Sequence, residues 1–93
     1  MHAQTTAQTI KAVVDRLASW DHVPVAIHLH DNDSGIVLYH RGTDAVWEDR
    51  PYVVHPFRRY PDPERCERVG LGNGSYDMTL EEGIEVFKKR SRF

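Results

Sequence analysis

Residues 23–40 read VPVAIHLHDNDSGIVLYH, and this stretch decides the fold. Aliphatic side chains at 25, 27 and 29 alternate with Ala26, His28 and His30, which is the two-residue period of a half-buried strand. The cluster 31–35 favours a turn, because Asx side chains bond the local backbone and glycine tolerates a positive φ. Residues 36–40 then run back as a β-branched and aromatic strand. We therefore predict a β-hairpin over this stretch.

The alternation also predicts which side chains of the first strand are buried. Successive side chains of a strand point to opposite faces of its sheet. We expect the odd-numbered aliphatic residues to pack under helices, whereas His28 and His30 face solvent.

A helix is expected before the hairpin, over residues 5–19. Its apolar residues recur at the spacing of one helical face: Ile10, Val13, Val14 and Leu17. Thr5 and Gln8 have the spacing of a capping box.

A second helix is expected after Thr79, with Glu82 at the capping-box position. Leu80, Ile84 and Phe87 would form its apolar stripe. Gly83 on the same side would let the backbone approach the sheet closely.

Between the hairpin and the last helix, residues 45–47 and 52–55 are predicted strands, the second stopped by Pro56. Connections this short imply antiparallel neighbours. Residues 57–77 read as a long loop, with a possible short helix opening at 62–65. Gly70, Gly72 and Gly74 would serve as a linker or tight turn there.

These elements predict an α+β fold in a single domain spanning 1–93, with residues 1–4 and 91–93 frayed. We expect a two-layer sandwich, in which an antiparallel three- or four-stranded meander is covered on one face by an N-terminal and a C-terminal helix.

Composition limits the classes of function. The chain has 93 residues and a formal net charge of −2, so it lacks the basic excess typical of nucleic-acid binding. Its one cysteine, Cys66, excludes an internal disulfide framework. No apolar run approaches a membrane span, and the N-terminus does not resemble a signal peptide. We expect a soluble, cytoplasmic protein without a cofactor.

The favoured function is that of a small non-enzymatic protein-binding module. Its size and composition suit an accessory protein, including one of the phage type that modulates a host protein. Histidine and aromatic side chains with few lysines suit a protein-binding patch. The predicted contact surface consists of six residues: His28, His30, His40, Arg58, Arg59 and Tyr60. The identity of the protein partner is open, and an exposed edge strand would also allow a homodimer.

A metal site is one alternative, with His28, His30 and Asp31 as ligands of a divalent ion such as Zn²⁺. The string 28–33 (HLHDND) resembles the His-x-His-x-Asp-His signature of metallo-β-lactamase-type hydrolases. It departs from that signature at Asn32 and Asp33, and the chain is too short for that fold.

Nucleic-acid binding is the other alternative. The order of a helix, three strands and a helix resembles the double-stranded RNA-binding domain, and Gly74-Ser75 ahead of the last helix fits this likeness. The resemblance implies phosphate contacts from a lysine cluster that opens the last helix. The corresponding positions here hold Thr79, Glu81 and Glu82, so nucleic-acid binding ranks below protein binding, although it ranks ahead of the metal site.

Overall fold

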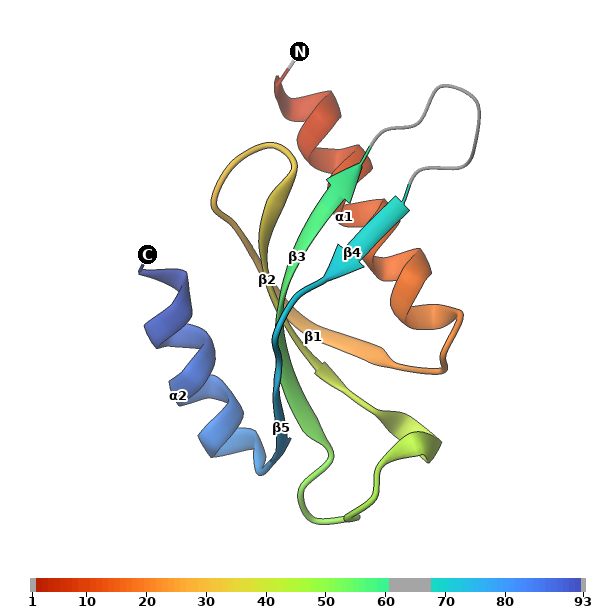
Figure 1. Ribbon diagram of the computed structural model, residues 1–93, viewed down its shortest axis with the longest axis vertical. Coiled ribbons are helices and arrows are strands. Elements are labelled where there is room, and N and C mark those ends of the chain that lie inside the picture. Colours follow the sequence, from red (N-terminus) through yellow and green to blue (C-terminus); the bar gives the residue numbers. More distant parts are fainter. Residues whose placement is uncertain (1, 61–67, 93) are drawn as a thin grey trace.

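The computed structural model describes residues 2–60 and 68–92 and shows two helices and a five-stranded sheet (Figure 1). The elements follow one another as α1 (His2–Ala18), β1 (Val23–Leu29), β2 (Ser34–His40), the 3-10 turn η1 (Gly42–Asp44), β3 (Tyr52–Tyr60), β4 (Arg68–Leu71), β5 (Ser75–Met78) and α2 (Leu80–Ser91). None of the helices within the described ranges is long and apolar enough to cross a membrane.

The sheet is an antiparallel meander in which β1 pairs with β2 and β2 pairs with β3. Ala26 lies opposite Leu38 and Leu29 lies opposite Gly35, which confirms the predicted hairpin. On its other side β3 pairs with two short strands, with β4 along its C-terminal half and with β5 along its N-terminal half. β4 and β5 together therefore act as one interrupted edge strand.

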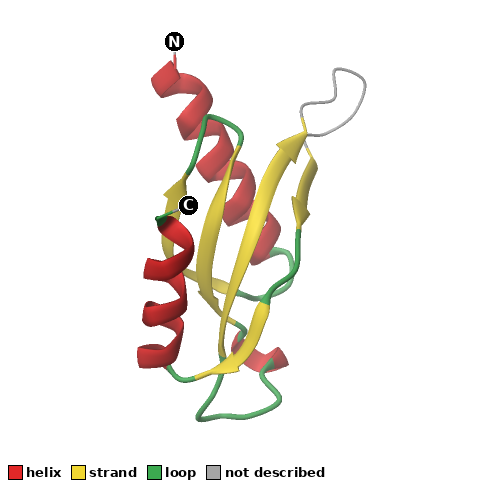
Figure 2. Cartoon of the chain, turned by 60° about the vertical axis from the view of Figure 1, so that its left-hand side comes forward, coloured by secondary structure: helices red, strands yellow, loops and turns green. Residues whose placement is uncertain are grey.

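The predicted α+β class is confirmed, because an N-terminal and a C-terminal helix flank an antiparallel sheet. The helices lie on opposite faces of the sheet, however, and do not share one face (Figures 1 and 2). Val37 packs in a cluster with α1, whereas its neighbour Leu38 packs in a cluster with α2. Both faces of β2 are apolar, so each face needs a cover.

Helix α1 buries a face that differs slightly from the predicted one. Thr9, Val13 and Leu17 are buried, whereas Ile10 is exposed. The Thr9 hydroxyl donates a hydrogen bond to the carbonyl of Asn32 at 2.6 Å, so a polar contact with the hairpin turn sets the helix rotation. The helix already begins at His2, and so the predicted capping box at Thr5 is wrong.

Helix α2 begins as predicted. The Thr79 side chain accepts from the Glu82 backbone N–H at 3.2 Å, and the Glu82 carboxylate accepts from the Thr79 N–H at 3.0 Å. Gly83 is buried, and a Cβ there would lie 2.9 Å from Leu38 Cδ1, which confirms the predicted close approach. Because Gly83 marks the contact line, Leu80 and Ile84 of the predicted stripe are exposed.

The predicted loop over 57–77 is largely wrong, because β3 continues through Pro56 to Tyr60, and β4 and β5 follow. The possible short helix at 62–65 lies outside the described residues. Residues 45–47, predicted as a strand, form part of the irregular connection between η1 and β3.

Each helix covers only part of its face of the sheet. Helix α1 contacts β1, β3 and β4, whereas α2 contacts β2, β3 and β5. This leaves one part of each face without a helix: the α2 face beside β4, and the α1 face beside β5. Both candidate sites lie there.

Candidate functional site

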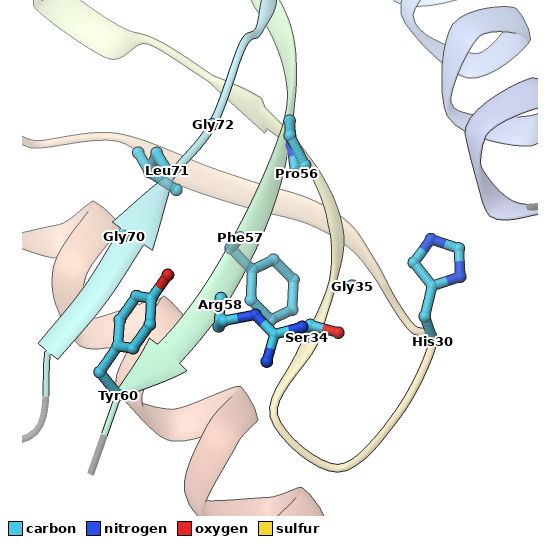
Figure 3. Close-up of a pocket in the computed structure, with 10 residues that line it drawn as sticks. All are labelled: His30, Ser34, Gly35, Pro56, Phe57, Arg58, Tyr60, Gly70, Leu71 and Gly72. Carbon is cyan, nitrogen blue, oxygen red and sulfur yellow. The ribbon is translucent and has the colours of Figure 1, made fainter.

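The first candidate site is a groove on the α2 face of the sheet, beyond the part that α2 covers (Figure 3). It has a volume of about 380 Å³. The lining comes from the hairpin turn, from the start of β2 and from β3 and β4: His30, Ser34, Gly35, Pro56, Phe57, Arg58, Tyr60, Gly70, Leu71 and Gly72. Four of these residues, namely Gly35, Gly70, Gly72 and Pro56, have no side chain or a compact one, which leaves space for the groove.

The groove presents a cation and an aromatic ring side by side. Arg58 is exposed, and within the described ranges no hydrogen bond or ion pair holds its guanidinium. Tyr60 is 54% exposed. Gly70 lies opposite Arg58 in the sheet, and a Cβ there would approach Tyr60 Cε2 to 3.2 Å, so the small residue leaves room for the ring.

The carboxylate of Asp31, which follows the groove residue His30 in the sequence, already accepts hydrogen bonds from the hairpin turn. Asp31 Oδ1 accepts hydrogen bonds from the backbone N–H groups of Asp33 at 2.8 Å and Ser34 at 2.7 Å. These donors, that of Asp33 foremost, hold the pKa of Asp31 below its ordinary value. The carboxylate therefore stabilises the hairpin turn as an Asx turn.

The structure brings together three of the six predicted contact residues, because His30, Arg58 and Tyr60 line the groove. His28 adjoins them through an edge-to-face contact with His30, with ring centroids 5.1 Å apart. His28 is half-buried and His30 is exposed.

The other two predicted contact residues lie elsewhere. Arg59 is only 6% exposed and pairs with Asp33 at 3.2 Å, because its side chain points to the opposite face from that of Arg58. His40 lies at the far end of β2, where its Nδ1 accepts from the Gly42 N–H at 2.8 Å and its ring meets Tyr52.

The alternative metal site gains no geometric support. Across the part of the chain that the structure describes, no three His, Cys, Asp or Glu side chains are arranged to hold a metal ion. Of the proposed ligands, Asp31 is engaged by the turn backbone.

The second candidate site lies where the His55 side chain replaces a backbone hydrogen-bond donor that the sheet lacks at Pro56. Gly72 donates its N–H to the Pro56 carbonyl at 2.9 Å, but Pro56 has no N–H to return. The Gly72 carbonyl instead lies 2.8 Å from Nδ1 of the neighbouring His55 side chain. The imidazole thus replaces the missing backbone donor, which explains how a proline can lie within an inner strand.

His55 also contacts Tyr76, because its Nε2 lies 2.6 Å from the Tyr76 hydroxyl. A carbonyl oxygen only accepts, so Nδ1 carries the proton, Nε2 accepts, and the tyrosine donates. A Cβ on Gly74 would lie 2.4 Å from Nε2, so this glycine makes room for the ring. Gly74 thus serves to pack the imidazole rather than to form a linker.

A bulge brings Tyr76 to this face. Tyr76 and Asp77 together oppose Val53, since the register shifts between Tyr52 and Val54. Asp77 has a φ of 54°, a left-handed conformation that Asp adopts more readily than most residues.

Buried rings extend this site into the protein. Tyr39 lies between His22 and His55, stacked on the two rings at centroid distances of 5.0 and 6.0 Å. Burial raises the pKa of Tyr39 to about 12 and lowers the pKa of His55 below its ordinary value. Tyr39 and His55 are 3% and 4% exposed, so both are buried members of the ring stack.

Ionisable side chains lie at both ends of this series of rings. The Arg41 guanidinium carbon lies 5.9 Å from the centroid of the Tyr76 ring, and Arg41 Nη1 lies 3.8 Å from Asp77 Oδ1. His22 Nε2 lies 3.3 Å from an Asp44 carboxylate oxygen.

Sequence reasoning missed this second site. His55 was assigned only to a strand, and Tyr76 is 21 residues further along the chain. The bulge that places Tyr76 beside His55 depends on the register of β5 against β3, which residue types alone do not indicate. Comparisons of this chain with protein-family models, with curated proteins and with solved structures found no match.

Proposed function

We propose that the protein is a small binding module that contacts a protein partner through the groove at His30, Arg58 and Tyr60. The observation that carries this proposal is the exposed pair of Arg58 and Tyr60 over a shallow, glycine-floored depression. Arginine and tyrosine are, with tryptophan, the side chains enriched at the interface positions that contribute most of the binding energy.

The charge of the groove favours a partner segment that carries a carboxylate. Arg58 acts on the Asp31 carboxylate through its charge but makes no salt bridge within the described ranges, whereas four other arginines are held by hydrogen bonds or ion pairs: Arg41, Arg50, Arg59 and Arg90. A planar guanidinium binds a carboxylate through two parallel hydrogen bonds. Tyr60 supplies a neighbouring apolar surface and His30 a further donor.

Affinity capture with matched baits tests the proposal. The wild-type bait and a control bait carrying Lys88→Glu and Trp47→Ala should retain the same partner from a lysate of the encoding organism. The bait carrying Arg58→Glu and Tyr60→Ala should lose it. The control makes the same charge change and also removes one exposed aromatic ring. Equal retention by all three baits would contradict the proposal.

Self-association is a second way in which the chain could bind protein. β1 is an edge strand of the sheet, and its Val23 and Val25 are exposed. Exposed edge strands can pair with another copy. Sedimentation of the purified chain separates this homodimer from binding to a different protein.

The two alternative functions keep their own tests. RNA or DNA binding would appear as a gel shift that weakens steeply with salt. Metal binding would appear as a rise in melting temperature with Zn²⁺ that His28→Ala with His30→Ala abolishes. We place the protein in the cytoplasm as part of the same proposal.

A further inference from the structure

The Tyr76 hydroxyl differs from an ordinary surface phenol. It donates a hydrogen bond of 2.6 Å to His55 Nε2, and the Gly72 carbonyl fixes the tautomer that leaves this nitrogen free to accept. The Tyr76 residue is nevertheless 51% exposed, so a reagent can approach it from solvent.

The contact between His55 Nε2 and the Tyr76 hydroxyl is not needed to replace the missing backbone donor at Pro56. Replacing the missing Pro56 donor uses only Nδ1 of His55. A half-exposed tyrosine could place its hydroxyl in water at little cost, yet the bulge at Tyr76 and Asp77 turns it onto Nε2. The result is a hydroxyl, a base and an orienting acceptor in series, which is the arrangement that activates a nucleophile.

A positive charge lies beside the phenol. Arg41 lies over the Tyr76 ring, with its guanidinium carbon 5.9 Å from the ring centroid. The same guanidinium pairs with Asp77, with Arg41 Nη1 3.8 Å from Asp77 Oδ1.

We propose that Tyr76 is a nucleophilic site that accepts an acyl group from an activated ester, with His55 as its general base. The Tyr76 oxygen attacks the ester carbonyl carbon while its proton passes to His55 Nε2. The bond from that carbon to the leaving oxygen then breaks, releasing the alcohol component as its anion. The products are an O-acyl tyrosine and an imidazolium, which loses its proton to solvent.

The chain offers an internal control for this reaction. Tyr60 is 54% exposed, close to the value for Tyr76, but no histidine is bonded to its hydroxyl among the described contacts. The test is to treat the folded protein with p-nitrophenyl acetate at pH 8 and to measure acetylation of each tyrosine by peptide mapping. Tyr76 should react at least about tenfold faster than Tyr60, since general base catalysis contributes about 10²–10⁴-fold. Equal rates, or a slower Tyr76, would overturn the proposal.

Two further measurements separate a base from a merely structural histidine. His55→Gln can still donate to the Gly72 carbonyl and accept from Tyr76, but it cannot take up a proton, so the rate ratio of Tyr76 to Tyr60 should fall towards one. In the wild type this ratio should also fall as the pH drops through the pKa of His55, which burial lowers below its ordinary value.

If His55→Gln does not fold, the pH dependence of the Tyr76-to-Tyr60 rate ratio in the wild type still tests whether His55 acts as a base. The titratable and charged groups that face His55 are Tyr39 and Tyr76 in the ring stack, with Arg90 and His22 acting at longer range. A ratio that is flat with pH would show that His55 only packs against the tyrosine and would overturn its role as a base.

Discussion

Gly74 has no room for a side chain, because His55 occupies that space. A Cβ at this position would lie 2.4 Å from Nε2 and 2.5 Å from Cε1 of the imidazole. Gly74→Ala must therefore displace the ring and weaken its bonds to Gly72 and Tyr76. We expect a loss of about 1–3 kcal/mol in the free energy of unfolding, measured by urea denaturation.

The control for this prediction is Gly70→Ala. There the nearest atom to an added Cβ is Cε2 of the exposed Tyr60 ring, at 3.2 Å, and that ring can move. The change in unfolding free energy should stay within about 0.5 kcal/mol. Equal losses at both positions would show that the His55 contact has no special weight.

The buried imidazole of His55 also predicts how stability depends on pH. Burial lowers its pKa in the folded protein below the ordinary value of about 6.5, so the unfolded chain binds the proton more readily. Its contribution is therefore fully present above about pH 6.5 and is lost as the pH falls through that value towards the folded pKa.

Denaturation at a series of pH values between 7.5 and 5 measures this loss. The lowered pKa values of Asp31 and Glu82 act below their ordinary values of 3.8 and 4.5, outside this range. His55→Gln should flatten the profile. A profile that keeps its slope in that variant would assign the effect to another histidine.

At the scale of the strand, β3 passes through Pro56 because the partner strand is interrupted there. The Pro56 carbonyl still accepts from Gly72, and the His55 side chain supplies the donor that proline lacks. Proline ends a regular inner strand because it cannot donate a hydrogen bond to the neighbouring strand. At the break between β4 and β5 the neighbouring strand is itself interrupted, so β3 can continue through Pro56.

A double-mutant cycle tests this account of the break. His55→Phe keeps a ring but leaves the Gly72 carbonyl without its donor, so it should cost about 1–3 kcal/mol. Pro56→Ala restores a backbone N–H at that point, and the cost of His55→Phe should then fall by about 1 kcal/mol. Additive effects in urea denaturation would contradict the proposed replacement.

Residue type predicted the elements that depend on local chemistry. The hairpin followed from alternation and an Asx turn, and the start of α2 followed from Thr79 and Glu82. The strands around the glycines after Val69 were not predicted. These glycines are needed because a Cβ at each would meet a side chain across the sheet, from Pro56, Tyr60 or His55. Contacts of that kind depend on register and not on local sequence.

At the scale of the whole molecule, the opposite placement of the helices defines the uncovered surfaces. The apolar run 36–39 is buried on both faces, which does not suit the predicted one-sided sheet. Because the helices cover different ends of the sheet, one face keeps the groove and the other keeps the ring stack. His30, Arg58 and Tyr60 were found from sequence as surface residues, but their meeting in one groove required the tertiary structure.

The most direct test of the groove as the contact surface is site-specific photocross-linking. A benzoylphenylalanine residue in place of Tyr60 should yield a discrete adduct with a protein of the encoding organism. The same residue in place of Glu85, on the exposed side of α2, should yield none. Adducts from position 85 without adducts from position 60 would contradict the account.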